Sequence, residues 1–137
     1  MNRQLVLTII VILAVVAGAT ALAQQHRPYN EIMKDVGATW ANLKKNLDEN
    51  SAAAAAQDAA KLEGLFAETE AFWTPLETKD AMNFAKNART GLAAVGAAAK
   101  ANDTKAALTL YAAVQKNCGN CHLAHREDTG KGFLIRP

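Results

Sequence analysis

Apolar residues recur at steps of three and four over most of the chain, which is the spacing of one face of an α-helix. The first of four such stretches runs from about Tyr29 to Leu47 and carries Ile32, Val36 and Trp40 on its apolar face. The pattern shows neither the alternation of a half-buried strand nor an internal repeat. It therefore predicts an all-α fold with four helices.

The other three helices are delimited by capping and breaking residues. The second starts after Asn50 or Ser51, both good N-caps, and stops before Pro75, because proline cannot continue a helix. By the same signals, the third helix covers about 79–100. The fourth runs from an N-cap at Asn102 or Asp103 to about Arg126. Four helices with short connections predict one domain, an antiparallel up-down-up-down bundle. Residues 127–137 contain two glycines and a proline, which predicts an irregular tail.

The first 23 residues have the pattern of a secretory signal peptide. Arg3 precedes an uncharged apolar run over residues 5–17, and Ala21-Leu22-Ala23 has the small-x-small form of a cleavage site. We expect cleavage near Ala23, export to the periplasm and a mature domain of residues 24–137 without membrane contact. The alternative is an uncleaved membrane anchor, since the apolar run is almost long enough to span a bilayer.

The charge balance narrows the classes of partner. The whole chain carries a formal net charge of +2, and loss of Arg3 with the signal peptide leaves +1. The basic residues form no clustered stripe of the kind that nucleic-acid binding needs. We therefore expect that the protein does not bind nucleic acid.

One motif carries candidate chemistry. The sequence Cys118-Gly-Asn-Cys121-His122 has the C-x-x-C-H form of covalent haem attachment. On a helix these three residues are related by steps of three and four, so their side chains share one face. The two thiols can then meet the two vinyl groups of one porphyrin while the imidazole reaches the iron. The motif predicts one covalent haem c, with Cys118 and Cys121 as thioethers and His122 as the proximal iron ligand.

Other uses of two adjacent cysteines fit the sequence less well. A redox-active dithiol would favour a βαβ context, which the helical pattern lacks. A structural zinc site would need further ligands, and the chain has only these two cysteines. A plain disulfide, the default in an exported chain, would leave His122 unexplained.

At this point the sequence resembles the class II c-type cytochromes, the cytochrome c-prime group and its low-spin relatives. The segment Cys118–Arg126 is similar to their C-x-x-C-H-x-x-aromatic-Arg pattern, and Ile32–Gly37 resembles their opening stretch. The resemblance covers most of the mature chain and implies the four-helix fold. The chain departs from the pattern at His125, where the family usually has tyrosine or phenylalanine, in a short connection around Pro75, and in its longer tail.

The resemblance also supplies an expectation for the sixth iron ligand. In the family, a methionine at the position matched to Met33 implies six-coordinate, low-spin iron, and His/Met ligation favours electron transfer. The alternative is that Met33 only fills the core, as methionine often does. Arg126 is expected to cover the haem edge or pair with a propionate, although a solvated cation at a helix C-terminus is the simpler reading. His125 is expected to pack or hydrogen-bond near the haem.

These residues favour a periplasmic monohaem electron carrier that meets redox partner proteins through transient contacts. The competing hypothesis is a five-coordinate protein that binds nitric oxide or carbon monoxide, which requires Met33 to be off the iron. A peroxidase-like enzyme is not expected, because no distal histidine is convincingly placed. A homodimer is possible, with the alanine-rich residues 52–56 allowing close contact.

Overall fold

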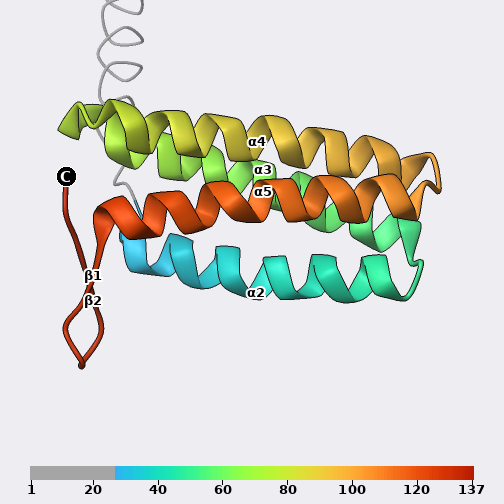
Figure 1. Cartoon of the computed structure of the whole chain (residues 1–137), viewed down its shortest axis with the longest axis horizontal. Helices are drawn as coiled ribbons and strands as arrows, with labels where there is room; N and C mark the ends of the chain where they lie inside the picture. The colour runs from blue at the N-terminus through green and yellow to red at the C-terminus, as the bar shows by residue number, and fades with distance from the viewer. Residues whose placement is uncertain (1–26) are drawn as a thin grey trace, which may run out of the picture.

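The computed structural model describes residues 27–137, and the predicted signal peptide, with its cleavage site near Ala23, lies outside these residues (Figure 1). The described chain forms four long helices, one 3₁₀ turn and two short strands: α2 (Tyr29–Asp48), α3 (Ala52–Trp73), η1 (Thr74–Leu76), α4 (Lys79–Lys100), α5 (Thr104–His125), β1 (Arg126–Asp128) and β2 (Phe133–Ile135). None of the helices in residues 27–137 is both long enough and apolar enough to cross a membrane.

The four helices pack against one another with alternating direction, so the predicted helical bundle is confirmed (Figure 1). Helix α3 packs against α2 and α4, and α5 packs against α4, whereas the contact between α2 and α5 is much smaller than these three. The start of α2 and the end of α5 lie at the same end of the bundle (Figure 1). This open seam between the first and last helices is where the candidate site lies.

Short connections with left-handed residues reverse the chain between helices. Asn50, Glu77 and Asn102 have φ of 54°, 54° and 58°, a region that asparagine adopts more readily than most residues. Asp103 is the N-cap of α5, since its Oδ1 accepts a hydrogen bond from the backbone N–H of Ala106 at 2.9 Å. These tight turns make consecutive helices antiparallel.

The core is built largely from alanine, which lets the helices approach closely. Ala55 and Ala59 of α3 and Ala85 and Ala88 of α4 are buried between larger side chains of the same cluster. Of the five residues 52–56, considered for a homodimer contact, Ala55 and Ala56 are buried in the chain's own core. The homodimer itself stays a prediction.

The C-terminal segment differs from the expected irregular tail. Helix α5 ends at His125, and residues 126–128 and 133–135 pair as an antiparallel hairpin, with Glu127 opposite Leu134. Gly130 and Gly132, with φ of 73° and 150°, form the turn that reverses the chain. The apolar run after the glycines has the β-propensity to pair, which explains the hairpin.

Candidate functional site

A cavity of about 720 Å³ lies at the open seam between α2 and α5. All four helices and the hairpin contribute to its wall, which is mostly apolar. Its volume lies in the range of pockets that hold small molecules and cofactors, roughly 300–1,000 Å³. The seam is therefore a cofactor-sized space inside the bundle.

The predicted attachment residues come together on the α5 side of this cavity. Cys118, Cys121 and His122 all line it and are half-buried, whereas Asn120 between them is exposed. Both thiols are free. Helix α5 continues through the motif to His125, so the expected sharing of one helix face is seen directly.

Burial keeps both thiols protonated. It raises the pKa of Cys118 to about 11, with a further contribution from Cys121, and the pKa of Cys121 is also raised, first by burial and then by the charge of Asp80. Redox-active dithiols have lowered thiol pKa values, since the thiolate is the reactive form. The electrostatics of this pair thus disfavour a dithiol exchange function.

The environment of His122 favours a neutral imidazole. Partial burial lowers the pKa of His122, and the positive charge of Arg126 lowers it further. The neutral ring is the form that binds a metal ion. Within residues 27–137 no three His, Cys, Asp or Glu side chains are grouped so that they could hold a metal ion.

Met33 lies on the α2 side of the same cavity. It is half-buried and packs against the core cluster while it lines the space. Met82 is also half-buried, but it does not line the cavity. One turn after Met33, Gly37 lines the wall, and a Cβ added there would meet nothing within 4 Å.

Aromatic residues stand along the cavity from the middle of the bundle to its end. Trp40 lines the inner part and stacks on buried Tyr111, with ring centroids 4.1 Å apart. Near the end of the bundle, the indole N–H of Trp73 donates a hydrogen bond to the hydroxyl of Tyr29 at 3.2 Å. Burial raises the pKa of Tyr29 to about 12, so this hydroxyl stays neutral.

His125, expected to pack or hydrogen-bond near a haem, is buried in the cavity wall beside Trp73. Its Nδ1 lies 2.8 Å from the carbonyl oxygen of Arg136, and its Nε2 lies 3.1 Å from Oδ2 of Asp80. Because both ring nitrogens have partners within the chain, the ring ties the hairpin to the start of α4. The hydrogen-bonding groups of the His125 ring therefore have partners without a haem propionate.

Arg126 is exposed at the mouth of the cavity, where its guanidinium lies over the ring of Phe133 at 4.1 Å from the centroid. Phe133, Leu134 and Ile135 of the hairpin line the same cavity. These three residues were not predicted to belong to the site from the sequence. The one feature of the sequence that points to these residues is that three consecutive apolar residues follow two glycines.

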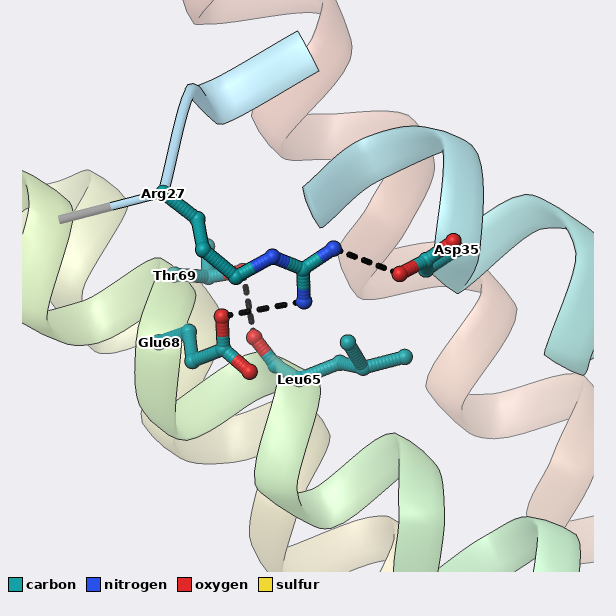
Figure 2. A network of polar contacts seen from close by, with 5 residues as sticks. All are labelled: Arg27, Asp35, Leu65, Glu68 and Thr69. Carbon is teal, nitrogen blue, oxygen red and sulfur yellow. Dashed lines mark hydrogen bonds and ion pairs between the residues drawn. The ribbon is translucent and has the colours of Figure 1, made fainter. Parts of the chain in front are cut away.

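A surface network fixes the chain just before α2 (Figure 2). The guanidinium of Arg27 binds Asp35 of α2 and, at 3.2 Å, Oε2 of Glu68 on α3. One turn of α3 is further tied by the hydroxyl of buried Thr69, which donates to the carbonyl of Leu65 at 2.9 Å. The hydrogen bond from Arg27 lowers the pKa of Asp35. Together the two ion pairs link α2 to α3 through Arg27, near the segment that carries Met33.

Comparison with family models, curated proteins and solved structures found no match to this chain.

Proposed function

We propose that this chain is a periplasmic monohaem c-type cytochrome that carries single electrons. The proposal rests on one observation: Cys118, Cys121, His122 and Met33 line a single apolar cavity of cofactor size. A haem bound there would supply the one-electron change between ferric and ferrous iron. The resemblance to class II c-type cytochromes, carried by Cys118–Arg126 in a four-helix bundle, supports the same conclusion.

Cys118 and Cys121 would hold the haem covalently. Each thiol adds across one vinyl double bond, so that sulfur joins one carbon and hydrogen the other, and no oxidant is consumed. Their separation by one helical turn places both sulfurs on the cavity side of α5. His122, on the same face and in its neutral form, would bind the iron from the α5 side.

Met33 would be the second axial ligand, from the α2 side. Of the two methionines in residues 27–137, it is the one that lines the cavity. Methionine opposite histidine raises the reduction potential and favours electron transfer. The core-filling alternative remains compatible with its half-buried position, and experiment separates the two.

Electron partners would approach where the attachment segment reaches the surface. Gly119 and Asn120 are exposed beside the two cysteines. A small, transient contact at this surface suits a carrier that must release each partner after transfer. The apolar residues around the cavity limit water near the iron.

The test is the absorption spectrum of the holoprotein, oxidised and reduced, with and without carbon monoxide. We expect a low-spin spectrum with the weak red band of methionine–iron bonding, unchanged by carbon monoxide. Met33→Ala should abolish that band, and the matched variant Met82→Ala should retain it. A wild-type spectrum that is high-spin and shifts with carbon monoxide would contradict Met33 ligation.

A high-spin spectrum of this kind would favour a gas-binding protein, and one observation supports that alternative. The open space beside Gly37, one turn after Met33 on the cavity wall, could admit a diatomic ligand. A five-coordinate iron would then bind carbon monoxide or nitric oxide on the α2 side. Filling the space with Gly37→Leu would weaken carbon monoxide binding under this alternative.

A further inference from the structure

We infer that the C-terminal hairpin is the outer wall of the haem site, and that Phe133, Leu134 and Ile135 cover the haem edge. This inference rests on the proposed function. It assigns a binding role to residues 126–137, the segment in which the chain is longer than the family it resembles.

The first support is an exposed apolar surface on the hairpin. Phe133, Leu134 and Ile135 are 58%, 59% and 36% exposed, although all three line the cavity. Because side chains alternate along a strand, one face of a hairpin that faces water is usually polar. Strand β2, however, is apolar on both faces. The cavity that they border also holds Cys118 and Cys121, so the occupant that covers them is the porphyrin attached to those thiols.

The second support is that the hairpin is held at the mouth of the cavity. The N–H of Arg136 donates to the carbonyl of His125 at 2.9 Å, and the His125 ring binds the carbonyl of Arg136 in return. The other ring nitrogen of His125 binds Asp80 at the start of α4. The base of the hairpin is thus tied to two helices through one buried side chain.

The third support is the contact of Arg126 with Phe133. The guanidinium lies over this ring, which keeps the hairpin's first aromatic residue beside the last turn of α5. The backbone N–H of Arg126 donates to the carbonyl of His122, and His122 and Phe133 line the same cavity. Strand β2 is therefore placed to exclude water from the haem, whereas the turn of the hairpin projects beyond the helices (Figure 1).

A dry haem edge has a measurable consequence. Removing water from around the iron disfavours the ferric state, which carries more positive charge, and so raises the reduction potential. It also slows the approach of small hydrophilic reagents. The apolar hairpin side chains can be changed without changing the attachment cysteines or the iron ligands, so their share of both effects can be measured separately.

The experiment compares holoproteins with substitutions inside and outside the cavity wall. Phe133→Ser combined with Leu134→Ser removes the proposed cover, and Phe133→Leu is the conservative variant at the same place. The matched control is Leu123→Ser, because Leu123 is 81% exposed and does not line the cavity. Where the double variant lowers haem yield, Leu134→Ser alone is used.

We expect the serine variants to lower the reduction potential and to speed oxidation of the ferrous protein by ferricyanide several-fold. Leu123→Ser should match the wild type in both, and Phe133→Leu, which keeps an apolar side chain at the cavity, should change each quantity less than the serine variants do. Serine variants indistinguishable from Leu123→Ser, with haem still attached, would overturn this inference and leave the proposed function standing. A loss of dimer on size-exclusion chromatography at unchanged potential would also overturn it, since the hairpin would then face a second copy of the chain. Wild-type protein without covalent haem would overturn the proposed function and this inference together.

Discussion

Single side chains hold distant parts of this chain together around the cavity. His125 connects the hairpin to α4 through Asp80, a residue 45 positions earlier in the sequence. Trp73 and Tyr29 are similarly joined across 44 positions, from the end of α3 to the start of α2. Such pairs cannot be predicted from helical spacing, because the period identifies an apolar face and not the partner across it. For the same reason the hydrogen bonds of His125 to Asp80 and Arg136 could not be predicted from the sequence.

The Asp80 carboxylate should make the stability of the fold sensitive to acid. Burial opposes its ionisation, but hydrogen bonds from the His125 ring and the Ala81 N–H outweigh this and lower the pKa of Asp80 below 3.8. A carboxyl with a lowered pKa in the folded state adds stability above its unfolded pKa and loses it as the pH falls through the folded value. Asp80→Asn should therefore lower the midpoint of urea unfolding at pH 7.

The difference between Asp80→Asn and the wild type should shrink as the pH falls below about 3.8, because the wild-type carboxyl is then protonated too. Urea unfolding at several pH values between 3 and 7, monitored by circular dichroism, gives the comparison. An equal deficit of the variant across this range would show that the ionised carboxylate is not what stabilises the contact.

The helices were largely predictable as elements, because their signals are local. The period of three to four sets each apolar face, α3 ends at Trp73 just before Pro75, and Asp103 caps α5. The hairpin was not predicted, because each strand has only three residues and β1 consists entirely of charged ones. Pairing with the apolar β2 gives β1 its structure, and such pairing lies beyond a local pattern.

Close packing between elements gives a paired prediction at two glycines. A Cβ at Gly91 on α4 would clash with Cγ2 of Val114 on α5, whereas a Cβ at Gly64 on α3 would meet nothing within 4 Å. Overpacking costs about 1–3 kcal/mol, and the gain in helix propensity is about 1 kcal/mol. Gly91→Ala should thus lower the free energy of unfolding by up to about 2 kcal/mol.

Gly64→Ala should raise the free energy of unfolding by about 0.5–1 kcal/mol, because it gains helix propensity without a clash. Chemical denaturation of both variants measures the pair under the same conditions. Stabilisation by both substitutions would mean that Val114 yields readily and that α4 and α5 are not tightly fitted at Gly91.

At the scale of the whole molecule, the sequence predicted the bundle but not the gap within it. The candidate residues Met33, Cys118, Cys121, His122 and Arg126 were found from a motif and a resemblance, and the structure brings all five to one cavity. The cavity arises because α2 and α5 pack less closely than the other neighbouring helices. That spacing depends on side chains from every element and is not a property of any one stretch of sequence. The hairpin wall was missed for the same reason.

The proposed function depends on covalent attachment of haem, which the intact mass of the denatured protein reports without further assumptions. The measurement uses protein recovered from the periplasm of cells that assemble c-type cytochromes. The account predicts a chain that starts near Gln24 and carries the added mass of one haem, and a Cys118→Ala, Cys121→Ala variant without that addition. A mature wild-type chain with no added mass, or one lighter by two hydrogens because its cysteines have formed a disulfide, would contradict the account.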